Sequence, residues 1–444
     1  MAGRPRTLSG WLRHAERLAP QPIVLGLDRV AEVWARLGSP RVAQRVFTVA
    51  GTNGKGSTAT ILAALLQAGG YRVGLYTSPH LLRYNERIRI AGAEVEDEAL
   101  ASAFARVEGA RRGVPLTYFE FGTLAAFLLF AEAGLDAAVL EVGLGGRLDA
   151  VNLIDPDVAL LTTVDLDHRE WLGPDREAIG REKAGIFRRQ RPALVGEADP
   201  PASVLAHARA IGAELWLRDR DFRFRDEGER WIWQGRRSGP LVLPPPALQA
   251  PPQRANAALA LAALEAAGEE ALLASEAPLR ALPALRLRGR LERLAEEPEI
   301  VLDVAHNPQA ARVLACWLER DAQPRTTFVL FGALREKDVA GMVAPLLPHV
   351  AEWHFCGLSR LSPRGLSAAE AYARARDLLG GRIAALHPDP GTAIRRLCAS
   401  VPKDGRILAF GSFHLGEGLL AALESEGRRK RATGLPRTSV SPRS

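Results

Sequence analysis

The 444-residue sequence has only three cysteines, and it has no stretch of about eighteen consecutive apolar residues. Cys316, Cys356 and Cys398 are widely spaced and odd in number, which argues against a disulfide framework and against clustered zinc ligands. The missing apolar run excludes a membrane-spanning helix, and the first residues lack the apolar core of a signal peptide. We therefore expect a cytoplasmic protein with no membrane partner.

An excess of charge of one sign is also nearly absent from most of the chain. The formal net charge is +7, but six basic and no acidic residues lie between Arg428 and Ser444, which leaves about +1 for the rest. A near-neutral body lacks the basic footprint that binds nucleic-acid phosphates, so we expect no nucleic-acid partner. Residues 427–444 have few core-forming side chains, and we expect a basic disordered tail there.

The chain exceeds the length at which one hydrophobic core stops growing, so we expect two domains. In the first, apolar strand-like runs alternate with helical segments, an order typical of a parallel sheet covered by helices. The expected strands are 45–50, 73–76, 137–142, 158–163 and 192–195, and the expected helices include 11–18, 57–68, 119–132 and 256–267. Short alternating segments between Phe222 and Leu243 predict an inserted β-hairpin or small antiparallel sheet.

A second alternation of strands and helices begins at Ile300. It predicts strands at 300–304, 327–331, 352–355 and 406–410, and helices at 309–320 and 338–347. A charged stretch with few core residues, 285–297, is expected to join the domains. We therefore predict an α/β protein with a first domain over residues 1–287, which has a parallel sheet and a small β insertion. A smaller Rossmann-like α/β domain is expected over residues 288–426.

The motif GTNGKGS, Gly51 to Ser57, follows an expected strand and opens an expected helix. In that context backbone N–H groups and the positive helix end bind phosphate. Lys55 would neutralise β- and γ-phosphate oxygens, and Ser57 would reach a magnesium ion. The motif departs from the commonest P-loop, because Val49 stands at the first glycine position and Gly56 separates Lys55 from Ser57. It points away from ordinary GTPases and kinases, and the alternative is a glycine-rich turn without a ligand.

Five further strings occur with this motif, in order along the chain. They are TSPHL, LEVGLGGRLDAVN, DH, REKAGIF and DVAHNP, at 77–81, 140–152, 167–168, 181–187 and 303–308. Individually some are weak, but jointly they resemble the folylpolyglutamate synthase family within the Mur ligase superfamily. The resemblance runs from about Trp11 to about Leu420. It implies that the first domain is a P-loop, Mur-ligase-like ATPase domain and that the second is a glutamate ligase domain.

The resemblance also implies an activity, that of a ligase that uses ATP to activate a carboxylate as an acyl phosphate and joins it to L-glutamate. Such an enzyme would make dihydrofolate from 7,8-dihydropteroate and then extend reduced folates to polyglutamates. Mg2+ would be its metal, with K+ as a further monovalent cation, and we expect a monomer. The implied ATP-binding residues are Thr52, Asn53, Gly54, Lys55, Gly56, Ser57, Asn256, Arg290 and Asp303.

Metal ligands and catalytic groups are implied in the same way. Ser78, Glu141 and His168 match the metal positions of the family, although a single strand-end glutamate or loop histidine is often structural. Lys55, Lys183 and His306 are the implied catalytic residues, and Lys183 matches a lysine that is carbamylated in the family. The alternative for Lys183 is an ordinary helix lysine paired with Glu177 or Glu182. Helix initiation at Asn307 and Pro308 also accounts for part of DVAHNP.

A pterin site is implied around three segments of the first domain. GLGGRLD fits the dinucleotide fingerprint GxGxxG badly, because Leu148 occupies its last glycine position. We instead expect Phe119 to stack on the pterin ring and Asp149 to accept its N–H groups, with core packing as the alternative for Phe119. The implied pterin-binding residues are Val24, Leu25, Gly26, Leu27, Thr117, Tyr118, Phe119, Glu120, Leu148, Asp149 and Ala150.

Other functions stay open at this stage. The closest alternative is a folylpolyglutamate synthase that lacks the first activity. A peptidoglycan precursor ligase is disfavoured because no separate amino-terminal domain for a nucleotide-linked sugar is expected. A P-loop nucleotide-binding regulator is the alternative outside enzymes, and TSPHL, REKAGIF and DVAHNP argue against it. The sequence departs from the family at Arg288, where proline is usual, and at Arg335, where histidine is frequent.

Overall fold

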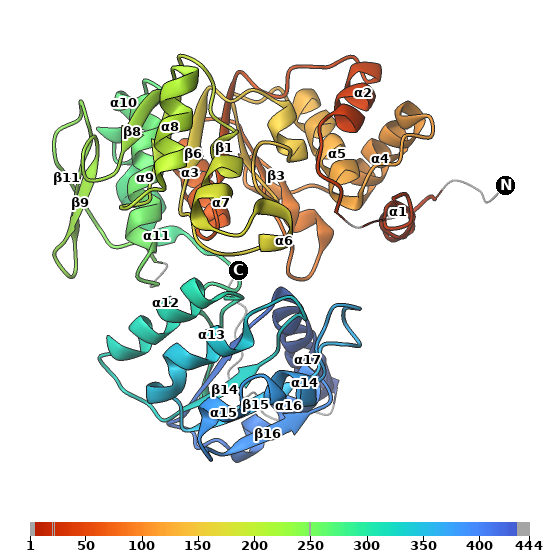
Figure 1. Ribbon diagram of the computed structural model, residues 1–444, viewed down its shortest axis with the longest axis vertical. Helices are drawn as coiled ribbons and strands as arrows, with labels where there is room; N and C mark the ends of the chain where they lie inside the picture. Colours follow the sequence, from red (N-terminus) through yellow and green to blue (C-terminus); the bar gives the residue numbers. More distant parts are fainter. Residues whose placement is uncertain (1–4, 20, 22, 248–249, 433–444) are drawn as a thin grey trace. The chain divides into compact units, whose positions relative to one another are not determined.

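The computed structural model describes residues 5–19, 21, 23–247 and 250–432, with side chains described up to residue 425. The chain forms two compact units, the first made mainly of residues before 286 and the second of residues from 286 onward. Each unit has helices packed around a mostly parallel sheet (Figure 1). The α/β class expected from the alternation of strands and helices is therefore confirmed.

The first unit is built on an eight-stranded sheet with the strand order β4-β3-β2-β5-β1-β6-β7-β8. The six strands from β2 to β8 in this order are parallel, whereas β3 and β4 add an antiparallel edge. Because helices cover both faces, the central strands are apolar along their length and not alternating. The strands are β1 Arg45–Ala50, β2 Val73–Tyr76, β3 Ile88–Ile90, β4 Ala93–Glu94, β5 Ala137–Glu141, β6 Val158–Leu161, β7 Pro192–Val195 and β8 Glu214–Leu217.

Helices of the first unit place its functional segments around this sheet. Helix α3 packs against β1, β2 and β5, and also against α9 and α11, while α4 and α5 pack against each other. The helices are α1 Leu8–Ala15, α2 Asp28–Arg36, α3 Lys55–Ala68, α4 Asp97–Arg111, α5 Tyr118–Ala133, α6 Arg169–Leu172, α7 Arg176–Ala184, α8 Ala202–Ile211, α9 Gln253–Ala266, α10 Glu270–Leu273 and α11 Ala277–Ala284. Two short 3₁₀ helices are η1 Tyr84–Arg87 and η2 Ala150–Leu153.

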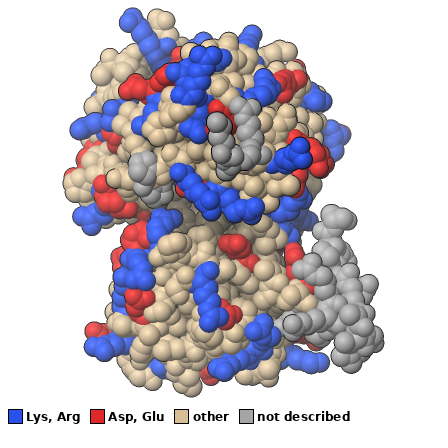
Figure 2. Space-filling view, turned by 90° about the vertical axis from the view of Figure 1, so that its right-hand side faces the viewer, with Lys and Arg blue, Asp and Glu red and all other residues tan. Residues whose placement is uncertain are grey.

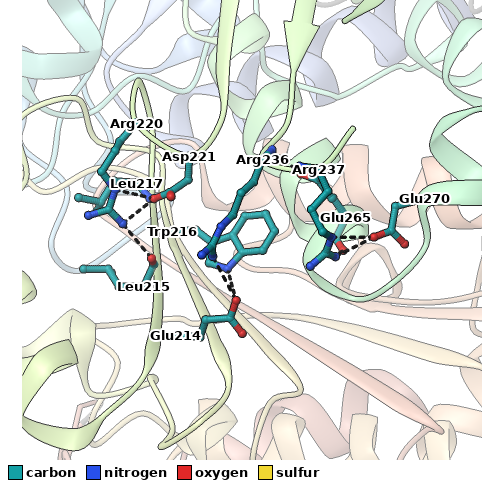
Figure 3. A network of polar contacts seen from close by, with 10 residues as sticks. All are labelled: Glu214, Leu215, Trp216, Leu217, Arg220, Asp221, Arg236, Arg237, Glu265 and Glu270. Carbon is teal, nitrogen blue, oxygen red and sulfur yellow. Dashed lines mark hydrogen bonds and ion pairs between the residues drawn. The ribbon is translucent and has the colours of Figure 1, made fainter. Parts of the chain in front are cut away.

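The expected β insertion is a three-stranded antiparallel sheet of β9 Arg223–Asp226, β10 Trp231–Gln234 and β11 Leu241–Leu243. Its main anchor is Glu265 near the end of α9, whose buried carboxylate accepts the backbone N–H groups of Arg236, Arg237 and Ser238. Figure 3 shows the guanidinium groups of Arg236 and Arg237 beside Trp216 of β8, 5.1 and 5.4 Å from its ring centroid. The insertion is thus fixed to α9 and to the edge of the main sheet.

The second unit has a six-stranded sheet with the order β12-β13-β17-β14-β15-β16, parallel except for β12. Its strands are β12 Glu292–Glu296, β13 Glu299–Leu302, β14 Thr327–Phe331, β15 Glu352–Cys356, β16 Ala384–His387 and β17 Arg406–Phe410. Its helices are α12 Pro308–Glu319, α13 Val339–Val343, α14 Ala368–Ala373, α15 Arg376–Leu379, α16 Pro390–Ser400 and α17 Phe413–Ala432, with the 3₁₀ helix η3 Ala344–His349. This is the expected smaller α/β sheet domain.

Two local expectations differ from the structure. The helix expected over 338–347 ends as an α-helix at Val343 and continues as η3, because Pro345 and Pro348 lack the N–H groups that an α-helix needs. Helix α17 continues to Ala432, so residues 427–432 are helical and not a disordered tail. The remainder of the expected tail, 433–444, lies outside the described residues.

The surface carries both signs of charge. Figure 2 shows Lys and Arg interspersed with Asp and Glu on the visible face. Within the described residues, no helix is long and apolar enough to cross a membrane.

Candidate active site

The glycine-rich motif forms the turn between β1 and α3. Gly51 and Gly54 have φ angles of 151° and 84°, which residues with a side chain rarely adopt. A Cβ atom on Gly51 would lie 1.8 Å from Oγ1 of Thr162, and one on Gly54 would lie 2.6 Å from Oδ1 of Asn256. The turn therefore requires both glycines. It lies at the N-terminus of a 14-residue helix, where free N–H groups and the helix dipole attract anions.

The loop after β6 holds the two middle residues of this turn. Thr52 donates its N–H to the carbonyl oxygen of Thr163 at 2.8 Å and its hydroxyl to that of Asp165 at 3.1 Å. Asn53 donates its N–H to Oγ1 of Thr163 at 3.0 Å. Protein contacts thus fix the shape of the loop without a ligand, which lowers the entropy cost of binding a phosphate.

Two lysines converge on one carbonyl oxygen of the turn. Lys55 Nζ donates to the oxygens of Gly51 and Thr52 at 3.0 and 3.1 Å, and Lys183 Nζ from α7 donates to the same Gly51 oxygen at 3.0 Å. Burial and, to a smaller extent, the charge of Lys55 lower the pKa of Lys183 to about 7, although Asp167 and Asp149 oppose the shift. The Lys183 amine is therefore partly neutral near neutral pH.

The ion pairs that were the alternative for Lys183 are not formed. Glu177 accepts the N–H groups of Ala202 and Ser203, and Glu182 binds Arg147 at 2.8 Å. Lys183 is only 4% exposed and donates a hydrogen bond to the Gly51 oxygen. It is thus directed at the phosphate loop and not at its own helix.

Two of the three expected metal ligands lie together. The backbone N–H of Ser78, in the loop after β2, donates to Oε2 of Glu141 at 2.8 Å, and Glu141 at the end of β5 is 4% exposed. A Cβ atom on Gly56 would lie 3.3 Å from the same oxygen, so Glu141 faces the first turn of α3. His168 precedes α6 with φ of 51° and donates its N–H to Asp167. Among described residues, no group of three or more His, Cys, Asp or Glu side chains could hold a metal ion.

Helix α9 brings two amides to the phosphate loop. Asn256 lies against Gly54, as its close approach to a Cβ there indicates, and donates to Oε1 of Gln253 at 3.1 Å. Gln253 in turn donates to the Ser57 hydroxyl at 3.4 Å. Both amides are buried, and Asn256 lies beside the glycine-rich loop.

The three expected pterin segments come together through Arg29 of α2. One Arg29 nitrogen donates to the carbonyl oxygen of Val24 at 2.7 Å and to Oε1 of Glu120 at 2.6 Å. The N–H of Gly26 donates to the carbonyl oxygen of Leu148 at 3.2 Å. The loop 24–27, the start of α5 and the loop 148–150 are therefore neighbours, although they are far apart in the sequence.

Some of the side chains in these segments already have protein partners. Glu120 accepts the N–H of Thr117 at 2.7 Å, closing a capping box at the start of α5, and also binds Arg29. Asp149 accepts the N–H groups of Leu144 and Val151 at 2.8 and 2.9 Å. Burial raises the pKa of Asp149 to about 6 despite these hydrogen bonds. Both carboxylates shape the loops, and Asp149 keeps lone pairs for a further donor.

The ring of Phe119 lies on the backbone of Gly143, because a Cβ there would lie 2.6 Å from its Cζ. Its centroid is 6.1 Å from that of Tyr76, and the side chain is only half-buried. The ring is therefore supported on one side and retains exposed surface, as a stacking platform requires. The other members of these segments, Leu25, Leu27, Tyr118 and Ala150, lie in the adjoining turns and at the starts of α2, α5 and η2.

Within the second unit, the expected residue Arg290 precedes β12, whereas Asp303 and His306 follow β13. Asp303 accepts the N–H groups of Leu291 and Ala305 at 2.9 and 2.8 Å, and burial raises its pKa while Arg290 opposes the shift. The guanidinium of Arg290 lies 5.7 Å from the Phe413 ring centroid. The centroid of His306 is 6.0 Å from that of Phe413. Arg290 and His306 thus share an aromatic neighbour.

Sequence reasoning did not find several residues of this site, namely Arg29, Gly143, Gln253 and Phe413. Gly143 belongs to the GLGGRLD string, so its glycine was a signal that a close approach was required. The other three act through contacts with residues more than ninety positions away or, for Gln253, almost two hundred positions away. No local pattern marks such contacts.

Comparison with known proteins adds an independent observation. The Mur ligase middle domain matches residues 49–217, and the Mur ligase glutamate ligase domain matches residues 289–413. The dihydrofolate synthase/folylpolyglutamate synthase of Escherichia coli is 45% identical over 364 residues, which cover 82% of this chain and 84% of that protein.

Two solved structures are similar over nearly the whole chain. Escherichia coli FolC in complex with DHPP and ADP has a TM-score of 0.88 and 40% identity, and covers 96% of this chain and 100% of that one. A bifunctional folylpolyglutamate synthase/dihydrofolate synthase with Mn, AMPPNP and L-glutamate bound has a TM-score of 0.86 and 43% identity, and covers 95% and 100%.

Proposed function

This chain belongs to the dihydrofolate synthase/folylpolyglutamate synthase family of Mur ligases, and we propose that it is an ATP-dependent ligase acting on pterin acids. It adds L-glutamate to 7,8-dihydropteroate to give dihydrofolate and extends reduced folates to polyglutamates. The observation that carries the proposal is the meeting of Lys55 and Lys183 at the Gly51 carbonyl, beside Glu141 and in the same unit as the pterin segments.

The reaction follows from this chemistry in two steps. An oxygen of the acid substrate attacks the γ-phosphorus of ATP, ADP leaves, and an acyl phosphate forms. The amine of glutamate then attacks the acyl carbon. The bond between that carbon and the phosphate oxygen breaks, and phosphate leaves. Lys55 and the N–H groups at the start of α3 stabilise the charge on the transferring phosphoryl group. The preformed loop holds it in position for attack.

We assign the divalent ion to Mg2+, which Glu141, the Ser78 hydroxyl and His168 would hold. The buried Glu141 carboxylate next to the first turn of α3 supports this, since oxygen donors suit Mg2+ and the ion commonly takes only one or two protein carboxylates. When bound, the ion neutralises charge on the β- and γ-phosphate oxygens. A monovalent cation such as K+ is a further expected ion.

Lys183 is proposed to be carbamylated. Its neutral amine attacks carbon dioxide and loses a proton, which gives an anionic carbamate. The lowered pKa of about 7 supports this, because only the neutral amine is nucleophilic. The modification also replaces repulsion between two ammonium groups with attraction between Lys55 and an anion.

The remaining assignments also rest on the resemblance and on local geometry. Asn256, Arg290 and Asp303 are proposed to bind the nucleotide, and His306 is proposed as a catalytic group. We assign residues 1–287 to ATP and pterin binding and residues 288–426 to the glutamate ligase domain, and we propose that the protein is a monomer.

The test is ADP formation by purified protein with glutamate and either dihydropteroate, tetrahydrofolate or no pterin. Turnover with both pterins is expected, and no pterin should give background only. Turnover with tetrahydrofolate alone would instead identify a folylpolyglutamate synthase without the first activity. ATP hydrolysis that is indifferent to pterin and glutamate would exclude ligation.

A further inference from the structure

Arg87 is a buried cation that no carboxylate of the described chain neutralises. Arg87, Lys183 and Arg406 are the buried Lys and Arg residues of the described chain, with 8%, 4% and 3% of their surface exposed. Arg406 forms ion pairs with Glu299 and Asp321. Among the described residues, no Asp or Glu lies within ion-pair distance of Arg87. A charge removed from water without a counter-charge destabilises a fold, so a retained one needs another reason.

The neighbours of Arg87 hold its guanidinium in one orientation. Nε donates to Nδ1 of His80 at 2.8 Å. The guanidinium carbon lies 5.0 Å from the ring centroid of Tyr84 and 5.7 Å from that of Tyr118. The two rings are themselves perpendicular, with centroids 5.6 Å apart. Within the described chain these contacts use Nε and the faces of the group, and they leave the two terminal nitrogens as donors.

A fixed guanidinium with two parallel donors suits a carboxylate, which it binds through two hydrogen bonds. A phosphate would also fit this fork, but the phosphate loop already has Lys55 and the first N–H groups of α3. Within the described residues, no hydrogen bond or ion pair joins the Arg87 side chain to that loop. The aromatic faces around it are better matched to the flat, apolar body of an aromatic acid.

Arg87 also connects the two halves of the site in the first unit. Its partner His80 follows Ser78, whose N–H binds Glu141. Its other partner, Tyr118, precedes Phe119, the proposed pterin platform. Arg87 thus contacts one residue next to Phe119 and one residue of the Ser78 loop, the two places that a pterin acid would connect.

We propose that Arg87 binds a carboxylate of the pterin acid substrate, an inference that rests on the proposed function. That carboxylate is either the one that is phosphorylated or, in a folate, the α-carboxylate of the glutamyl tail. Both have the same chemistry, and both need a charged fork close to the aromatic part of the site.

The test compares Arg87→Met with the matched variant Arg89→Met. Arg89 is two residues away, and its side chain is 38% exposed and paired with Glu94 at 3.4 Å. Calorimetric titration should show that Arg87→Met weakens binding of dihydropteroate, of tetrahydrofolate or of both at least about tenfold. An analogue without the carboxyl group should bind both proteins equally, and Arg89→Met should bind like the wild type. Equal ratios of acid to analogue affinity in the wild type and Arg87→Met, for dihydropteroate and for tetrahydrofolate alike, would overturn the proposal, as would a loss of AMPPNP affinity alone.

Turnover then identifies the carboxylate. A fall in kcat with both dihydropteroate and tetrahydrofolate assigns Arg87 to the reacting group, whereas a rise in KM confined to tetrahydrofolate assigns it to the α-carboxylate. Should Arg87→Met fail to fold, Arg87→Lys keeps the charge and removes the fork, and the same affinity ratio decides. Because the ratio is a binding measurement, it stands apart from the proposed function, which fails only if the wild type shows no turnover.

Discussion

The ammonium groups of Lys55 and Lys183 share one acceptor, the carbonyl oxygen of Gly51, at 3.0 Å each. Burial lowers the pKa of Lys183, and repulsion between the two positive charges on one neutral acceptor adds to this shift. The arrangement becomes favourable if one of the two groups changes sign. The shared acceptor thus connects the phosphate loop to Lys183 of α7, a helix that begins 121 positions after the start of α3.

Lys55→Ala should abolish ADP formation with dihydropteroate and glutamate, with a loss of at least about 100-fold in kcat. The reason is the missing positive charge at the phosphoryl group. The fold should be unchanged, because the Lys55 side chain packs on the loop surface and not in the core. Lys403→Ala, at an exposed position, is the control. Unchanged turnover of Lys55→Ala would remove the loop from the mechanism.

Lys183→Ala should be inactive, and short carboxylates such as acetate should restore part of its activity. The added anion would occupy the volume left by the carbamate and supply the same negative charge. Lys183→Arg cannot form the carbamate and fills the space, so it should stay inactive with acetate. Steady-state rates measured against acetate concentration test this. Full activity of Lys183→Ala without any addition would contradict the carbamate.

Gly143→Ala should raise the KM for dihydropteroate about tenfold and leave the KM for ATP unchanged. Its Cβ would lie 2.6 Å from Cζ of Phe119 and would displace the ring from its place. Gly109→Ala in α4 is the matched control, because a Cβ there meets no atom within 4 Å. Equal KM values for dihydropteroate in the two variants would show that the position of the ring is unimportant.

Acidification from pH 7.5 to 5 should destabilise the second unit through His354 and His387. A hydrogen bond of 3.0 Å joins Nδ1 of His354 on β15 to Nε2 of His387 on β16. Burial lowers the pKa of both histidines, that of His387 to about 4. The folded state then binds fewer protons than the unfolded one between the folded pKa and about 6.5. Stability is therefore complete above about pH 6.5 and falls below it, by roughly 1 to 3 kcal/mol.

Urea unfolding at several pH values, compared with His354→Gln/His387→Gln, measures this effect. The double variant should lose most of the change between pH 7.5 and 5, because its amides do not titrate. The same pH dependence in both proteins would assign the effect to other groups.

Much of the fold was predictable because its central strands are continuous apolar runs between turn residues. The strands 45–50 and 327–331 were expected with the bounds that the structure has. The strands at the margins of the two sheets, β3, β4, β8, β12 and β16, were missed, since they are short and their extended form depends on a partner strand. The sequence of β12, ERLAE, alone favours no strand.

The residues of the site were also predictable only where a local pattern marks them. The motif GTNGKGS predicts its turn from the local sequence, because glycines with positive φ and a following helix are local features. The function of Arg29 as the bridge between Val24 and Glu120 depends on packing between α2 and α5, which no local pattern encodes. Asp149 was expected to face a ligand, yet its first partners are N–H groups of its own loop.

Helix α9 connects the small β insertion to the phosphate loop. The first turn of α9 places Gln253 and Asn256 against the phosphate loop. Further along, the Ala258 carbonyl accepts the indole N–H of Trp233, and Glu265 near the end of the helix binds the backbone of the insertion. The helix spans about 14 Å from Asn256 to Glu265. A shift of one end along the helix axis therefore moves the other end. Weakening the contacts of Glu265 should therefore lower the affinity for ATP, although no residue near the triphosphate is changed.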